Sequence, residues 1–173
     1  MILLADSGST KTEWKAIEGE VPSESIFSSG INPYFLGSEQ IIINLKKEVP
    51  SLEGKPFDSV FFYGTGCNSE AREKVIRDAL DKYLKSANIF IGSDLLGAAR
   101  ALCGNEPGIA CIMGTGSNSC YYDGKKIAAN VAPLGYILGD EGGAAVLGKK
   151  LLSAVLKKQM SEAVINRFYE TFN

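Results

Sequence analysis

The sequence contains no histidine, and none of its four cysteines forms a CxxC pair with another. A histidine general base and a zinc site built from cysteine and histidine are therefore excluded by composition. Cys111 lies within the apolar run 109–113, and we expect it to be a small core residue. The remaining cysteines are Cys67, Cys103 and Cys120.

Neither sign of charge dominates, because 18 lysines and arginines stand against 20 aspartates and glutamates. The lysine doublets are scattered, so the sequence predicts no nucleic-acid partner. No apolar run approaches the roughly 20 residues that a membrane-spanning helix needs. Met1 leads directly into a strand-like run at 2–5, without the pattern of a signal peptide. We expect a cytoplasmic protein with no membrane partner.

Apolar residues alternate between strand-like and helix-like spacing along the chain, which indicates a mixed α/β fold. The segment 104–108 is the best linker signal, and a strand and a glycine turn restart after it. We therefore predict two lobes, residues 1–104 and residues 105–173, the second one cut short. Strands are expected at 2–5, 13–17, 25–28, 59–63, 88–91, 109–113, 120–122 and 127–131. Helices are expected at 38–49, from Asn68 or Ser69 to Tyr83, and at 94–103, 144–156 and 162–169.

The first chemical motif is Asp6-Ser7-Gly8-Ser9-Thr10, directly after a buried strand. A carboxylate at a strand end can hold Mg²⁺, and a glycine turn can present backbone N–H groups to phosphate oxygens. Gly8 matters because a residue without Cβ lets the backbone approach an anion closely. The alternative is an ordinary hairpin turn.

A second glycine turn, Gly114-Thr115-Gly116-Ser117-Asn118, follows another apolar strand. It lacks the spacing of a P-loop, and Ser119 stands where a dinucleotide-binding motif has its third glycine. A second phosphate clamp and a plain hairpin both remain open.

Two acidic positions lie at the start of predicted helices. Asp94 follows a strand and precedes a helix, a place where ligands of open α/β sheets bind, although an aspartate there is also a favoured N-cap. The loop Gly139-Asp140-Glu141-Gly142-Gly143 places three glycines around two acids ahead of a helix. A close approach to a ligand explains these glycines better than a flexible loop.

Together and in this order, the four motifs resemble the N-acetylglucosamine kinase and BadF/BcrA-type ATPase family, which has the actin-like ATPase (ribonuclease H-like) fold. The resemblance covers nearly the whole chain. It implies an ATP-dependent sugar kinase acting on N-acetylglucosamine or a related amino sugar or hexose, with ATP and Mg²⁺ between two lobes. It leaves a homodimer open.

The resemblance also assigns roles to individual residues. It implies that Asp94 is the general base and that Asp6 holds the metal. Nucleotide binding falls to Asp6, Gly8, Ser9, Thr10, Lys11, Gly114, Thr115 and Gly116. Sugar binding falls to Asn32, Thr65, Gly66, Thr115, Asn118 and Asp140.

Two departures and two alternatives accompany this interpretation. Ser7 and Ser9 flank Gly8 where many relatives have more glycines, and the second lobe is short, so the adenine-binding part is not among these residues. One alternative is an ATPase that activates a 2-hydroxyacyl-CoA dehydratase or benzoyl-CoA reductase. Its iron–sulfur cluster needs clustered cysteines, and iron-free, colourless protein would exclude it. The other is a sugar sensor without turnover.

Overall fold

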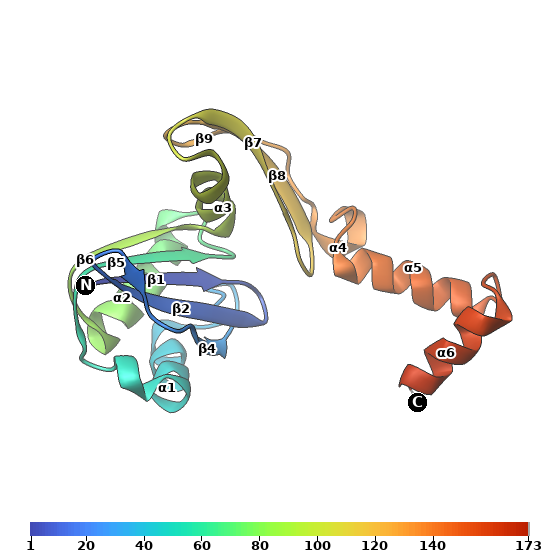
Figure 1. Ribbon diagram of the computed structural model, residues 1–173, viewed down its shortest axis with the longest axis horizontal. Helices are drawn as coiled ribbons and strands as arrows, with labels where there is room; N and C mark the ends of the chain where they lie inside the picture. Colours follow the sequence, from blue (N-terminus) through green and yellow to red (C-terminus); the bar gives the residue numbers. More distant parts are fainter. Residues whose placement is uncertain (173) are drawn as a thin grey trace.

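Two separate β-sheets, joined by helix α3 (Asp94–Cys103), organise the computed structural model, which describes residues 1–172 (Figure 1). The first sheet has six strands in the order β3-β2-β1-β5-β6, with β4 paired to β2. Strand β1 is antiparallel to β2 and parallel to β5, which is parallel to β6. The strands are β1 (Ile2–Ser7), β2 (Lys11–Glu18), β3 (Val21–Pro22), β4 (Ile26–Ser29), β5 (Pro56–Gly64) and β6 (Lys85–Ser93).

Helices cover both faces of the first sheet, because successive residues of its strands point to opposite faces and place apolar side chains on each. Leu3, Trp14 and Phe62 point to one face and form the main core with α1 (Ser38–Glu48) and α2 (Glu70–Tyr83). Tyr63, the next residue along β5, points to the opposite face and meets α3 at Gly97. Figure 1 shows α3 and the pair α1 and α2 on opposite sides of the sheet.

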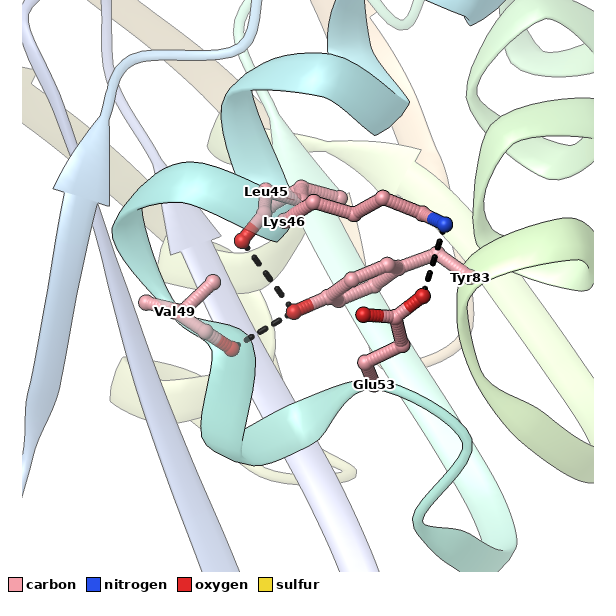
Figure 2. A network of polar contacts seen from close by, with 5 residues as sticks. All are labelled: Leu45, Lys46, Val49, Glu53 and Tyr83. Carbon is pink, nitrogen blue, oxygen red and sulfur yellow. Dashed lines mark hydrogen bonds and ion pairs between the residues drawn. The ribbon is translucent and has the colours of Figure 1, made fainter.

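A buried tyrosine joins α1 to α2 far from the glycine turns (Figure 2). The hydroxyl of Tyr83 lies 3.1 Å from the carbonyl oxygen of Leu45 and 2.5 Å from that of Val49. Burial raises the pKa of Tyr83 to about 12, with a smaller effect of Glu53, so the phenol remains a donor at neutral pH. An ion pair between Lys46 and Glu53 (2.7 Å) lies beside it. The helical layer is thus held at the carbonyl groups that end α1.

The second sheet is an antiparallel meander in the order β7-β8-β9. Helix α3 packs against it through Leu95 and Ala99, which contact Ala110, Cys120 and Tyr122. Helices α5 and α6 extend away from both sheets (Figure 1). The elements after α3 are β7 (Pro107–Met113), β8 (Ser117–Asp123), β9 (Ile127–Asn130), α4 (Gly135–Leu138), α5 (Ala144–Leu156) and α6 (Glu162–Phe172).

The expectation for Cys111 was wrong, because this side chain is exposed. Its neighbour Ala110 points inward against α3, so the alternation of β7 turns Cys111 to the other face. That face carries further exposed apolar side chains, among them Ile109 (75% exposed) and Met113 (78%).

The expected mixed α/β architecture is confirmed, because a mixed sheet of six strands carries helices and is followed by a second, antiparallel sheet. The predicted helices 94–103 and 144–156 have the observed bounds, and most strands run one to three residues further than expected. The third expected strand is β4, which pairs antiparallel to β2. The short β3, α4 and a 3-10 turn, Pro50–Leu52, were not predicted. The division into lobes at residues 104 and 105 remains a prediction. None of the helices among residues 1–172 is both long and apolar enough to cross a bilayer.

Candidate active site

A cavity of about 1270 Å³ brings together segments that are far apart in the sequence. Its walls come from the β1–β2 hairpin, the ends of β5 and β6, the start of α3, and the β7–β8 turn with the loop before α5. Most of the residues predicted to be functional line it: Asp6, Gly8, Ser9, Thr10, Lys11, Thr65, Gly66, Asp94, Gly114, Thr115, Gly116, Asn118 and Asp140. The parallel strands β1, β5 and β6 all end at this edge, which explains why these residues meet.

The first glycine turn is the tight connection between β1 and β2. Gly8 N donates to the carbonyl oxygen of Lys11 (3.0 Å), which turns the chain over four residues. Burial raises the pKa of Asp6, and the opposed carboxylate of Glu13 raises it further, whereas Lys11 lowers it. Asp6 is thus a carboxylate with too little positive charge around it, which suits a cation ligand.

Asp94 is the first residue of α3, and Ser93 takes the capping role. The Ser93 hydroxyl accepts from Leu96 N (3.2 Å), whereas Asp94 Oδ1 accepts from the adjacent Leu95 N (2.8 Å). Burial raises the pKa of Asp94, the bond from Leu95 lowers it, and the charge of Asp6 raises it again. The cap of α3 therefore does not depend on Asp94. The carboxylate of Asp94 lies in the same cavity as the carboxylate of Asp6.

The second glycine turn and the acidic loop form one unit at the start of α5. Ala144 N and Ala145 N donate to the carbonyl oxygens of Gly114 (2.9 Å) and Thr115 (3.0 Å). A Cβ on Gly116 would lie 2.6 Å from Oδ2 of Asp140, and a Cβ on Gly143 would lie 2.7 Å from the backbone carbonyl carbon of Gly116, so the turn and the loop pack too closely for a side chain at Gly143. Asp140 itself has a φ of 58°, an uncommon conformation for a residue with a side chain.

Asn32 is the one predicted sugar-binding residue that does not line the cavity. Its Oδ1 accepts from Tyr34 N (2.9 Å) and lies against Gly66, where a Cβ would approach to 2.6 Å. Tyr34 takes the place on the wall, with the guanidinium of Arg72 3.5 Å from its ring centroid. Tyr34 was not predicted to be functional from the sequence, nor were Tyr63, Asn68 and Asn130, which also line the cavity. A signal for Tyr34 was its place in the Asn-Pro-Tyr turn.

The side chains in this cavity fit a magnesium nucleotide. Two carboxylates with raised pKa values, Asp6 and Asp94, share it, and a cation would relieve their repulsion. Between residues 1 and 172, no group of three or more histidine, cysteine or acidic residues is placed to hold a metal by itself. Magnesium that arrives with ATP needs no such group, because phosphates and water complete its octahedral shell.

No family model and no curated protein matches the sequence. Among solved structures, a "Putative N-acetylglucosamine Kinase" from Porphyromonas gingivalis is 45% identical, with a TM-score of 0.91 over 99% of this chain. A protein of the same description from Chromobacterium violaceum (16% identity, TM-score 0.68, 98% of this chain) and the ROK hexokinase from Thermus thermophilus (15%, 0.53, 99%) share the fold.

The chain spans 62% of the P. gingivalis protein, 63% of the C. violaceum protein and 69% of the hexokinase. Relative to those proteins, the second lobe is represented by its first part. The alignment with the P. gingivalis protein covers 99% of this chain, so it includes both sheets and the cavity. The chain therefore has the actin-like ATPase fold, and over 99% of its length it is similar to the P. gingivalis protein described as a "Putative N-acetylglucosamine Kinase".

Proposed function

We propose that the protein transfers the γ-phosphoryl group of ATP to a hydroxyl of N-acetylglucosamine or a closely related amino sugar. One observation carries the proposal: the half-buried carboxylate of Asp94 shares a cavity with Asp6 and with both glycine turns. A carboxylate for the acceptor hydroxyl and two turns for phosphate are the parts that a sugar kinase needs. The proposal implies a reaction in the cytoplasm, where ATP is available.

On the nucleotide side, Asp6 would hold Mg²⁺, which neutralises charge on the transferring phosphoryl group when it is bound. Ser9, Thr10 and Lys11 from the first lobe line the same side of the cavity and offer hydroxyl and ammonium donors to phosphate oxygens. The turn Gly114-Thr115-Gly116, which belongs to the second sheet, also lines the cavity and would contribute to binding the phosphates. Because the two turns belong to different sheets, closing the cavity around ATP would bring both onto the phosphates and exclude water.

On the acceptor side, Asp94 would orient the sugar hydroxyl and accept its proton as the oxygen–phosphorus bond forms. Thr65, Asn118 and Asp140 line the same cavity and offer hydrogen-bonding groups to a sugar. A site built from such groups discriminates strongly against an acceptor that lacks the matching hydroxyls, because its own polar atoms are then left unpaired. The 45% identity to the P. gingivalis protein supports an amino sugar as the acceptor.

A substrate comparison tests the reaction itself. Full-length protein with Mg·ATP is expected to phosphorylate N-acetylglucosamine with a higher kcat/KM than glucosamine, N-acetylmannosamine or glucose. Coupled ADP release and detection of the sugar phosphate measure this. ATP hydrolysis that no sugar stimulates would refute the kinase function.

Asn32→Ala is expected to raise the KM for the sugar about tenfold or more and the KM for ATP less than threefold, in line with the loss of hydrogen bonds worth about 1–3 kcal/mol. The reason is that Asn32 fixes Tyr34 and adjoins Gly66, both on the cavity wall.

Initial rates at varied sugar and varied ATP give the two KM values for Asn32→Ala. Asn44→Ala is the matched control, because Asn44 lies on α1 and accepts a hydrogen bond from Gln40 (2.9 Å) away from the cavity. Equal changes in both KM values for Asn32→Ala would contradict the assignment.

A further inference from the structure

Among the serine and threonine residues that the structure describes, three are buried: Ser7, Thr12 and Ser28. Ser7 and Thr12 are both 0% exposed, and their oxygens are 2.7 Å apart. Neither side chain reaches the cavity, so neither has a part in the reaction described above. A buried hydroxyl costs free energy unless it is hydrogen-bonded, so the partners of these groups are informative.

The hydrogen-bond partners of Ser7 connect it to two segments on the acceptor side of the cavity, residues 30–32 and residues 64–66. Its side-chain oxygen accepts from Ile31 N (3.0 Å), in the segment that continues to Asn32. Its backbone carbonyl accepts from Thr65 N (2.8 Å), at the end of β5. Ser7 itself lies between Asp6 and Gly8 in the first glycine turn (residues 6–10), which we call the nucleotide turn. One residue thus connects the nucleotide turn to 30–32 and to 64–66.

Thr12 continues this connection on the neighbouring strand. Its hydroxyl donates to the carbonyl oxygen of Ser29 (3.1 Å). The Ser7 hydroxyl also lies 3.3 Å from the carbonyl oxygen of Ile31, which is farther than the 2.7 Å to Thr12. The shorter distance favours a chain in which Ile31 N–H donates to Ser7, Ser7 donates to Thr12, and Thr12 donates to Ser29. Every hydrogen of this buried chain is then used, which makes it specific for one placement of the segment 29–31.

Direct packing supports the same link independently. Gly30 lies so close to the nucleotide turn that a Cβ would approach the carbonyl oxygens of Gly8 and Ser9 to 2.5 and 2.6 Å. Gly30 N also donates to the carbonyl oxygen of Thr10 (3.0 Å). A shift of the nucleotide turn must therefore be followed by the segment that leads into Asn32 and Tyr34.

We propose that Ser7 and Thr12 are positioning residues that couple the nucleotide turn to the acceptor loop, so that Mg·nucleotide and sugar bind with positive cooperativity. This rests on the proposed function and adds a device to it. When phosphates order the turn Asp6–Thr10, the buried hydroxyls transmit that order to 29–32, and the sugar then binds to a loop already in place. By linkage, the sugar must tighten nucleotide binding by the same factor.

Calorimetric titration of full-length protein with N-acetylglucosamine, with and without saturating Mg·ADP, tests the proposal. We expect Mg·ADP to lower the Kd of the sugar at least about fivefold in the wild type. In Ser7→Ala the ratio of the two Kd values should fall below twofold, since Ile31 N–H loses its acceptor. Thr12→Val breaks the next link while keeping the side-chain shape, and should have the same effect if Ser7→Ala does not fold.

Tyr83→Phe is the matched control, because the buried Tyr83 hydroxyl donates to the carbonyl oxygens of Leu45 (3.1 Å) and Val49 (2.5 Å) and lies outside this chain of bonds. It should lower the melting temperature and keep the wild-type Kd ratio. A Ser7→Ala protein with the wild-type ratio would overturn the proposal, and so would wild-type protein that binds both ligands independently. Those results leave the kinase function standing, whereas wild-type protein that binds no sugar overturns both.

Discussion

Asp94→Asn is expected to lower kcat at least about a hundredfold, within the 10²–10⁴-fold range of a general base. An amide cannot accept the proton of the sugar hydroxyl. The variant should still fold, because its Oδ1 can accept from Leu95 N as the carboxylate does, and because Ser93 caps the helix. Steady-state kinetics, the melting temperature and the Kd of the sugar together measure this.

Ser93→Ala is the control that separates catalysis from helix capping. It removes the bond to Leu96 N and should cost about 1 kcal/mol of stability while kcat stays within a few fold. If Asp94→Asn also keeps kcat within a few fold, Asp94 is not the base, and a sugar-binding protein without turnover becomes the better interpretation.

The pH dependence of kcat provides a second test of the role of Asp94. Burial raises the pKa of Asp94, and the base is active only as the carboxylate. The rate is therefore fully developed above the raised pKa and lost as the pH falls through it, at a higher pH than for an ordinary aspartate. This acid limb should be absent from the residual activity of Asp94→Asn.

Asp6→Ala is expected to reduce Mg²⁺-dependent turnover to background in full-length protein. Asp6 is the carboxylate of the nucleotide turn, and without it the metal would lose the protein ligand that we propose for it. Turnover across a magnesium titration, together with Mg·ADP binding, measures the loss. Unchanged turnover would show that the turn is only structural.

Glu13→Gln is the control for the loss of charge. Glu13 lies opposite Asp6 on β2, lines the same cavity and is one of the groups that raise the pKa of Asp6. Its neutralisation changes the local charge by the same amount but removes no proposed metal ligand. We expect turnover within several fold of the wild type, so a general electrostatic effect can be told apart from metal binding.

Local patterns in the sequence were sufficient for most of the fold. Helices 94–103 and 144–156 could be placed because their apolar spacing and flanking glycines are local signals, and the glycine turns after 2–5 and 109–113 follow from short-range sterics. The order of the motifs indicated the family, and with it the meeting of residues 6, 94, 114–116 and 140 in one cavity.

Other features could not be read from the sequence because they depend on contacts between distant segments. Cys111 faces outward because helix α3 packs against the other face of β7. Tyr34 reached the cavity wall because Asn32 and Gly66 turn the chain there.

The sequence by itself determined which chemical groups are present: carboxylates beside glycine turns, no histidine, and a mixed α/β pattern. These follow from composition and from the local rules of turns and periodicity. Only the tertiary structure decided that Ser93 caps α3 and leaves Asp94 to the cavity, and that Ser7 and Thr12 form a buried link to Ile31. The physical reason is that a hydroxyl or carboxylate accepts whichever N–H the fold brings to it, and residues 7 and 31 meet only after β1 and β2 have paired and β4 has paired with β2.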